Sequence, residues 1–354
     1  MKTPKSLYWL ALTAALALAF TGCKKDDDAS RPGNLTIEKT EYTLDADEER
    51  TATVAFTATA DWTLSVAYDD AESSADWLTV TPTSGTAGEQ TVELSAARNF
   101  RASARTAYAD LVCGEQSVRL TVTQTAASDA TDFTAQFDPD FAKELQKQGI
   151  IADAEHITPE DMEKIAAITS LDVSGTEDAP GALTSLQGIE YFESLTDLEC
   201  EYNRLTSLDV SANTKLTWYF YCGGNQLTSL DVSNCTALGK LYCYDNQLTS
   251  LDVSRNTALT NLVCYSNQLT ELDVSQNTML TSLQCHYNQL TTLDVSRNTA
   301  LTQLYCSYNP GDGVSSFPIT AWFDNDTKPD NLEIDREQWT YDGKTITIDF
   351  RKAE

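Results

Sequence analysis

Cysteine recurs at a fixed interval in the second half of the chain. Five cysteines follow one another every 21 residues and a sixth precedes them by 22: Cys200, Cys222, Cys243, Cys264, Cys285 and Cys306. Thiols at such intervals could be metal ligands, halves of disulfides, nucleophiles or apolar packing groups. Which of these applies depends on the elements that carry the cysteines.

The cysteines belong to a repeating unit, LxxLxCxxNxLxxLDVSxNx. Its LDVS segment begins at Leu171, Leu208, Leu230, Leu251, Leu272 and Leu293, and its first asparagine is Asn203, Asn225, Asn246, Asn267, Asn288 and Asn309. The one interval of 22 contains LTWYFYCGGN, where the extra residue predicts a bulge. Units of this period stack into a solenoid. The unit resembles the leucine-rich repeat of the cysteine-containing 21-residue type found in internalin-like bacterial proteins.

Stacked repeats place equivalent residues in columns about 4.8 Å apart. The leucines and the cysteine of LxC point inward, and the asparagine bonds the backbone where each coil turns. In-register side chains point in parallel and do not bring the Cβ atoms of neighbouring cysteines to disulfide distance, and a straight column offers no tetrahedral zinc geometry. We therefore expect a column of buried thiols.

The aspartates of LDVS form a second column: Asp172, Asp209, Asp231, Asp252, Asp273 and Asp294. Unit charges about 5 Å apart repel by roughly 0.8 kcal/mol even in water, so such a column needs compensation. Hydrogen bonds from nearby backbone N–H or threonine hydroxyl groups would supply it. Bridging calcium ions are the alternative.

The variable positions beside each cysteine are rich in aromatic residues and point outward, on the face that leucine-rich repeats keep concave. The candidate binding surface is Tyr202, Tyr221, Tyr242, Tyr244, Tyr265, His286, Tyr287, Tyr305 and Tyr308. Tyrosine gives large amphipathic contact area at low entropic cost, which favours recognition of a partner. Cross-strand aromatic pairs that only stabilise the sheet are the structural alternative.

The N-terminus has the pattern of an export signal. Lys2 and Lys5 precede an apolar run over residues 7–20, which is too short for a confident membrane span. AFTGC, which ends at Cys23, resembles a bacterial lipobox, and KKDDD at 24–28 resembles the surface-export signal of Bacteroides-type lipoproteins. The resemblance implies a signal peptide at 1–22, a lipidated Cys23 with a linker at 23–33, and anchoring in the outer membrane, exposed at the cell surface. An ordinary cleaved signal followed by a solvated linker is the alternative.

Residues 34–126 show short apolar and polar alternations between turn-like segments, the pattern of a small antiparallel β-sandwich. DWLTVTPTSGTAGEQTVELSAARN at 76–99, with ADWTLSV around Trp62 and the closing TVTQ, resembles a BACON module, an immunoglobulin-like sandwich associated with carbohydrate-active proteins. Trp62 and Trp77 could form a sugar platform, but a sandwich core usually buries its tryptophans.

Both ends of the repeats show capping patterns. Residues 127–170 hold a linker and two short amphipathic helices, with Asp138 and Thr158 as N-caps and Pro139 and Pro159 behind them. After the repeats at 171–310, residues 311–354 suggest β-strands joined by a turn at Asp342 and Gly343. The expected fold is mainly β with some α: a small β-sandwich, then a leucine-rich-repeat solenoid with a helical N-cap and a β-rich C-cap.

Composition narrows the function. Lys and Arg number 24 against 53 Asp and Glu, a net charge of −29 that argues against nucleic acid as a partner. The chain has two histidines and no catalytic motif, so we expect no enzyme, no cofactor and no metal. The leading hypothesis is a surface-anchored module that binds a host or bacterial protein through the tyrosines. A carbohydrate-binding accessory protein, using the BACON-like module or the same tyrosines, is the alternative.

Overall fold

The computed structural model describes residues 33–47, 49–68, 77–127 and 132–353. The predicted signal peptide, the lipidation site Cys23 and the acidic stretch 24–28 lie outside the described residues. The prediction of a mainly β chain with a few helices is confirmed. Neither α-helix in the described part has the length and apolar character needed to cross a membrane.

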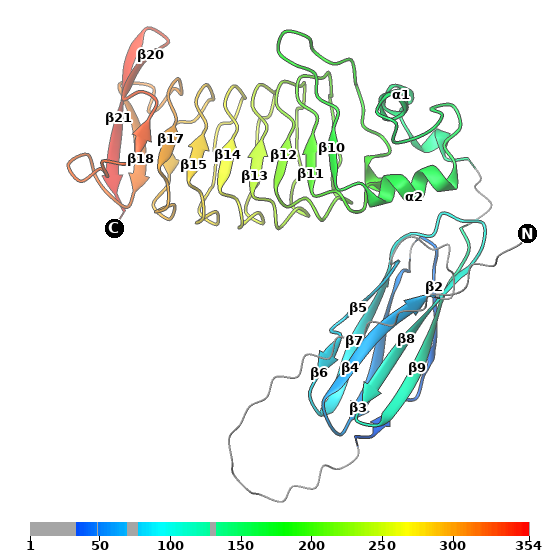
Figure 1. Cartoon of the computed structure of the whole chain (residues 1–354). Coiled ribbons are helices and arrows are strands. Elements are labelled where there is room, and N and C mark those ends of the chain that lie inside the picture. Colours follow the sequence, from blue (N-terminus) through cyan, green and yellow to red (C-terminus); the bar gives the residue numbers. More distant parts are fainter. Residues whose placement is uncertain (1–32, 48, 69–76, 128–131, 354) are drawn as a thin grey trace, which may run out of the picture.

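The first unit of the fold is a pair of β-sheets around one hydrophobic core (Figure 1). Its strands are β1 (Leu35–Thr36), β2 (Glu41–Leu44), β3 (Thr51–Ala58), β4 (Trp62–Tyr68), β5 (Leu78–Thr81), β6 (Ser84–Gly85), β7 (Gly88–Ala96), β8 (Arg105–Cys113) and β9 (Gln116–Gln124). One sheet has the order β1-β3-β7-β5 and the other β2-β9-β8-β4-β6, and all pairs are antiparallel except β2 with β9. Trp62 and Trp77 are 1% and 2% exposed, so both are core residues and neither is a sugar platform.

Two helices follow, α1 (Pro139–Lys147) and α2 (Pro159–Ala167), with 3-10 turns at Thr134–Gln136 (η1) and Ile189–Tyr191 (η2). The Asp138 carboxylate accepts hydrogen bonds from the backbone N–H groups of Asp140 and Phe141. Thr158 and Asp161 form a reciprocal capping box. Both predicted N-caps are therefore confirmed, and the helices precede the first repeat strand (Figure 1).

The repeats form one parallel sheet of eight strands in the order β10-β11-β12-β13-β14-β15-β17-β19. The strands are β10 (Ser170–Asp172), β11 (Asp197–Glu199), β12 (Tyr219–Tyr221), β13 (Lys240–Tyr242), β14 (Asn261–Val263), β15 (Ser282–Gln284), β17 (Gln303–Tyr305) and β19 (Glu333–Ile334). The register pairs leucine with leucine, for example Leu241 with Leu262 and Leu262 with Leu283. Figure 1 shows these strands side by side along the array.

The thiol column is buried and unpaired. All six repeat cysteines are 0% exposed, and every described cysteine, including Cys113 and Cys235, is free. Burial raises the pKa of the Cys243 thiol to about 12, and it raises the pKa of Cys222, Cys264 and Cys285 as well. Thiols that stay neutral at pH 7 are poor nucleophiles and metal ligands, so this column acts as packing.

The asparagine column joins the repeats through the backbone. The Nδ2 of Asn246 donates to the carbonyl oxygens of Cys243 and Tyr244 in its own repeat and of Cys222 in the repeat before. Its Oδ1 accepts from the N–H of Leu227 at 2.9 Å. Asn225, Asn267, Asn288 and Asn309 make equivalent bonds. The predicted structural role of this column is confirmed.

A second asparagine column lies at the other turn of the coil. Asn256, Asn277 and Asn298 each donate to two backbone carbonyls of the preceding repeat, at 2.9 Å. Cys235 occupies the equivalent position one repeat before Asn256, and its sulfur lies 3.9 Å and 3.8 Å from the carbonyl oxygens of Val210 and Asn213. Each of these two carbonyls accepts one backbone N–H, from Asn213 and Leu216, and has only the weak thiol donor in place of the second, amide donor.

A four-stranded sheet closes the C-terminal end, in the order β16-β18-β21-β20. Its strands are β16 (Leu293–Asp294), β18 (Ser316–Ala321), β20 (Gln338–Tyr341) and β21 (Lys344–Lys352). Asp342 and Gly343 link β20 to β21 with φ of 47° and 72°, the left-handed pair of a tight hairpin. The predicted turn at these two residues is confirmed.

The sandwich is joined to the helical cap by a packed and charged contact. Phe100 is 4% exposed and its ring lies 5.7 Å from Phe133 and 6.2 Å from Tyr191. Glu193 pairs with Arg50 at 3.0 Å and with Arg98 at 3.3 Å. Sequence reasoning did not identify this joint, because its residues are far apart in the chain. It holds the sandwich against the cap.

We expect Cys235→Asn to stabilise the protein. The amide would donate to the carbonyls of Val210 and Asn213, as Asn256 does one repeat later. Each net hydrogen bond contributes about 1 kcal/mol, and the new Oδ1 stays unpaired, so a gain of roughly 1 kcal/mol is expected. Urea unfolding of both proteins measures it. A lower stability of the variant would show that thiol packing outweighs the missing donors.

Candidate binding surface

The nine predicted surface residues lie on one side of the parallel sheet, and we call them the tyrosine face. Tyr242 and Tyr305 lie between the inward leucine and the cysteine of their repeats, and Tyr221 lies between the inward Phe220 and Cys222. Tyr244, Tyr265 and His286 follow the cysteine, and Tyr202, Tyr287 and Tyr308 come one residue later. The structure therefore brings all nine together, along strands β11 to β17.

Most rings of the tyrosine face stack on a ring of the next repeat. Centroid distances are 4.3 Å for Tyr221 and Tyr242, 4.9 Å for Tyr244 and Tyr265, and 4.6 Å for Tyr265 and His286. Offset stacking of this kind adds about 0.5–1.5 kcal/mol per pair beyond buried area. The alternative that cross-strand aromatic pairs stabilise the sheet therefore holds for these rings, which stabilise the same sheet that carries them.

The residue two positions after the cysteine of a repeat has a left-handed backbone conformation. Tyr202, Tyr287 and Tyr308 have φ of 52°, 52° and 55°, and Gly224 has 65° at the matching place. Non-glycine residues adopt this conformation at a cost, and here the turn before the asparagine imposes it. The rings of Tyr287 and Tyr308 stack at 4.2 Å as a result.

Tyr244 is packed, which corrects the prediction that it is a free surface residue. It is 8% exposed, and its ring covers Gly223 so closely that a Cβ there would lie 2.5 Å from a ring carbon. Its hydroxyl donates to the Tyr202 hydroxyl at 3.1 Å, and it also hydrogen bonds Glu201. Alternation alone could not show this, because the space exists only where the preceding repeat has glycine.

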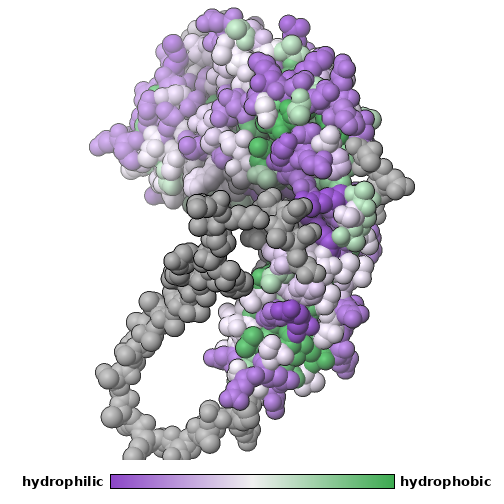
Figure 2. Space-filling model, turned by 45° about the vertical axis from the view of Figure 1, so that its right-hand side comes forward, coloured by the Kyte–Doolittle hydropathy of each residue, from purple (hydrophilic) through white to green (hydrophobic). Residues whose placement is uncertain are grey.

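The most exposed aromatic side chains of the array are Trp218, which directly precedes β12, and Tyr287 of the tyrosine face. Trp218 is 68% exposed and Tyr287 is 49% exposed. Trp218 belongs to the repeat with the extra residue, where β12 and β13 share two registered pairs and the neighbouring strands share three. Sequence reasoning noted the extra residue but missed Trp218. Figure 2 shows mostly hydrophilic residues on the part that carries the repeats, with hydrophobic ones in small groups.

Burial affects the ionisation of several rings of the tyrosine face. Burial raises the pKa of Tyr221 and of Tyr265 to about 12. Burial lowers the pKa of His286, which is stacked on Tyr265 and has an Nδ1 with no partner among the described atoms. The face therefore offers aromatic area, hydroxyl groups and one neutral imidazole.

The aspartate column is compensated locally. Asp209, Asp231, Asp252 and Asp273 each accept a hydrogen bond from the backbone N–H of the serine two residues later, at 2.8–2.9 Å. Hydrogen bonds from this serine lower the pKa of all four carboxyl groups. The backbone donors that were predicted are confirmed. Across the described residues, no group of three or more His, Cys, Asp or Glu is placed to hold a metal ion.

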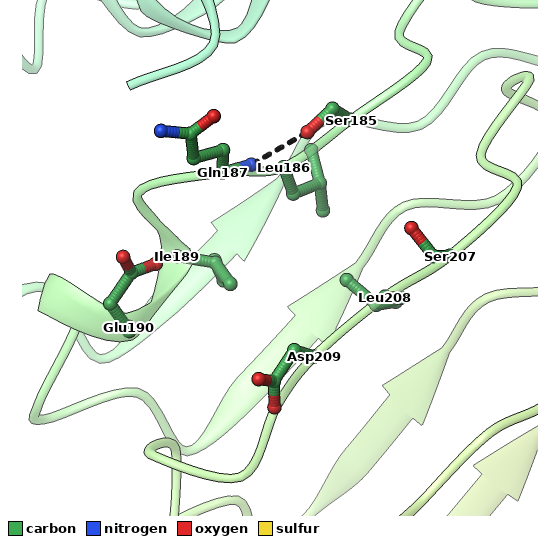
Figure 3. Close-up of a pocket in the computed structure, with 8 residues that line it drawn as sticks. All are labelled: Ser185, Leu186, Gln187, Ile189, Glu190, Ser207, Leu208 and Asp209. Carbon is green, nitrogen blue, oxygen red and sulfur yellow. Dashed lines mark hydrogen bonds between the residues drawn. The ribbon is translucent and has the colours of Figure 1, made fainter. Parts of the chain in front are cut away.

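A hollow of about 350 Å³ lies away from the tyrosine face, between the opening segment of the array and the next coil (Figure 3). Its walls include Ser185, Gln187, Glu190, Ser207 and Asp209. The N–H of Gln187 donates to the Ser185 hydroxyl at 3.0 Å, and Glu190 accepts from the N–H of Gly188. These polar groups serve the local turns, and none of the predicted binding residues lines the hollow.

Comparison with known proteins identifies one segment by family. Residues 34–127 match the Viral BACON domain family, which supports the BACON-like prediction for 34–126. The search of curated proteins gives no match.

Three solved structures are similar to this chain over part of its length. The functional domain of InlJ from Listeria monocytogenes, described as including a cysteine ladder, is 26% identical, with 62% of this chain and 61% of that chain covered and a TM-score of 0.26. The internalin InlF of the same organism is 23% identical, with coverages of 55% and 67% and a TM-score of 0.41. The leucine-rich repeat domain of APL1B is 23% identical, with coverages of 46% and 48% and a TM-score of 0.36. This chain spans less than two thirds of the first structure, and with scores this low function is inferred from the chain's own geometry.

The contact between Gly223 and Tyr244 predicts a coupled pair of substitutions. Gly223→Ala should lower the free energy of unfolding by about 1–3 kcal/mol, because the new methyl group overlaps the Tyr244 ring. In a Tyr244→Ala background the same substitution should cost much less. Urea unfolding of the four proteins completes the cycle. If Gly223→Ala lowered the free energy of unfolding equally with and without the Tyr244 ring, that ring would not contact Gly223.

The aspartate column predicts acid sensitivity. The folded pKa of Asp209, Asp231, Asp252 and Asp273 lies below the unfolded value of about 3.9, so their contribution to stability is complete above that pH and is lost as the pH falls through the folded pKa. Replacing all four with asparagine keeps the acceptor and removes the titration. The melting temperature of the variant should therefore fall less steeply below about pH 4 than that of the parent. If the melting temperatures of the variant and the parent fell equally steeply with pH, this explanation would be wrong.

Proposed function

We propose that this protein is a non-enzymatic, surface-anchored lipoprotein that binds another protein through the tyrosine face. The observation that carries the proposal is the row of outward aromatic residues on a regular sheet, from Tyr202 to Tyr308, with Trp218 strongly exposed beside it. Tyrosine and tryptophan dominate the energetics of protein interfaces. A sheet that fixes their spacing also reduces the entropy lost on binding.

We infer that the array is a leucine-rich-repeat solenoid. Its support is the parallel in-register sheet, the buried leucine and cysteine columns and the asparagine bonds between repeats. Each coil buries its apolar side chains only against its neighbours, so the binding face is as rigid as the stack beneath it. The helices before it and the β16-β18-β21-β20 sheet after it serve as caps in this proposal.

The proposed anchor is a lipid on Cys23, with localisation at the outer membrane and exposure at the cell surface. The support is the sequence pattern alone: the apolar run at 7–20, the AFTGC segment and the acidic stretch that follows. The charge of −29 keeps the proposed partner a protein and not a nucleic acid. The joint at Phe100 and Glu193 would hold the sandwich in a fixed position at the membrane side of the array.

A glycan is the second candidate ligand. Trp218 favours it, because an exposed indole next to Tyr219 offers a flat stacking surface. Trp62 and Trp77 no longer support it, because both are buried in the sandwich core. A glycan array with segments 34–126 and 128–354 separates the candidates, and sugar binding by the first segment alone would overturn the protein-binding proposal.

The binding prediction concerns the exposed aromatic residues. Trp218→Ala with Tyr287→Ala should reduce capture of a surface-protein partner by about tenfold or more, the effect of losing interface hot spots. Pull-down with the mature protein and quantitative mass spectrometry measures it. Met279→Ala is the matched control, because Met279 is 55% exposed and lies outside the tyrosine face. Capture that is unchanged in the first variant and in a Tyr221→Ala, Tyr265→Ala variant would contradict the proposal.

A further inference from the structure

Four carboxylates gather at the first strands of the sheet, next to the tyrosine face. Asp172 is in register with Glu199, and Glu199 is in register with Tyr221. Asp197 and Glu201 lie two residues before and after Glu199 on the same side of the sheet. None of the ion pairs formed by the described residues includes any of these four. The fold thus holds several negative charges together without a cation of its own.

The environment of these carboxylates is unfavourable to their charge. Burial raises the pKa of Glu199 and of Glu201, and the charge of Asp172 raises both further. The Oδ1 of Asp197 is buried and has no hydrogen-bond partner among the described atoms. Side chains on adjacent strands are about 5 Å apart, where two unit charges repel by roughly 0.8 kcal/mol in water. A bound cation would remove this repulsion.

Tyrosine partners hold the two glutamates in place. Glu199 hydrogen bonds the side chain of Tyr219, and Glu201 bonds Tyr244. Asp231 and Asp252 of the LDVS column differ from these glutamates, because each accepts a hydrogen bond from a serine N–H and hydrogen bonds from that serine lower the pKa of its carboxyl group. The pKa is thus raised for Glu199 and Glu201 and lowered for Asp231 and Asp252.

Aromatic surfaces adjoin the carboxylates. Tyr219 stacks on Tyr221 at 4.9 Å, Tyr221 stacks on Tyr242 at 4.3 Å, and Trp218 precedes them with 68% exposure. A guanidinium group binds a carboxylate with paired hydrogen bonds and also stacks on an aromatic ring. Carboxylates beside half-buried tyrosine rings and an exposed indole are complementary to arginine in both respects.

We propose that Asp197, Glu199, Glu201, Trp218 and Tyr221 form a docking surface for a protein segment that presents arginine side chains. The inference rests on the proposed function, because it specifies the partner of the same face. The three carboxylates lie at alternate positions along β11 and the residues after it, about 6.6 Å apart for each step of two residues, which is wide enough for more than one guanidinium group. Charge complementarity selects this partner: the surface has aromatic area and carboxylates with no ion-pair partner, and β13, two strands away from β11, contributes one cation, Lys240.

The test uses a matched pair of fluorescent decapeptides, one alternating glycine with arginine and one with citrulline in place of arginine. Citrulline keeps the shape and removes the charge. Fluorescence anisotropy with the full mature chain at physiological salt should show that the arginine peptide binds at least about tenfold more tightly, as expected where charge-assisted bonds are lost. Equal binding of the two peptides, or no binding of either, overturns the proposal.

Two charge variants locate the site. Glu199→Gln with Glu201→Gln should weaken binding of the arginine peptide by about tenfold, whereas Asp231→Asn with Asp252→Asn should change it less than about twofold, although both remove two charges from the array. Trp218→Ala should also weaken binding of the arginine peptide, and it removes a side chain that is 68% exposed and so adds little to the core. Equal weakening by the two charge variants would mean nonspecific attraction and would overturn the site.

The proposed function and this inference fail in different ways. If the glutamine variant captures the surface-protein partner as well as the parent does, while Trp218→Ala with Tyr287→Ala does not, the arginine partner is wrong and protein binding by the tyrosine face stands. If no aromatic variant affects capture, the proposed function fails as well.

Discussion

Every side chain in this array must pack against a copy of its own position in the repeats on either side. Parallel in-register pairing places Leu262 between Leu241 and Leu283, at a spacing set by the strands. A residue type persists in such a column only if it is compatible with itself. Leucine and the thiols pack, asparagine passes a hydrogen bond from coil to coil, and tyrosine rings stack. Aspartate repels its copy, so each LDVS aspartate depends on a serine N–H.

This constraint explains how much could be predicted from the sequence. Period and alternation alone determine which residues share a column and which face each column occupies, so the thiol core, the asparagine bonds and the aspartate turns were accessible. The helix caps and the Asp342–Gly343 hairpin were accessible for a different reason, because their signals are local.

The remainder depends on contacts between unlike positions. Tyr244 is buried because Gly223, one repeat earlier, has no side chain. Trp218 is exposed because an extra residue is accommodated at one point of a strand, and the sequence does not fix which side chain turns outward. Phe100 lies in the sequence segment that was predicted to be the sandwich, but its ring packs against Phe133 and Tyr191 of the cap. Periodicity contains no information about any of these three arrangements.

The pairing of Gly223 with Tyr244 also bears on how such an array can change in length. Repeat proteins gain and lose whole units by duplication and deletion. Loss of the unit that carries Tyr244 would bring Tyr265 into the same place over Gly223, and the ring contact would survive, since the next unit also supplies tyrosine. Loss of the unit that carries Gly223 would set Tyr244 beside Glu201, and its ring would no longer lie over a glycine. Deletion of the unit that carries Tyr244 therefore keeps an aromatic ring over Gly223, whereas deletion of the unit that carries Gly223 removes the contact.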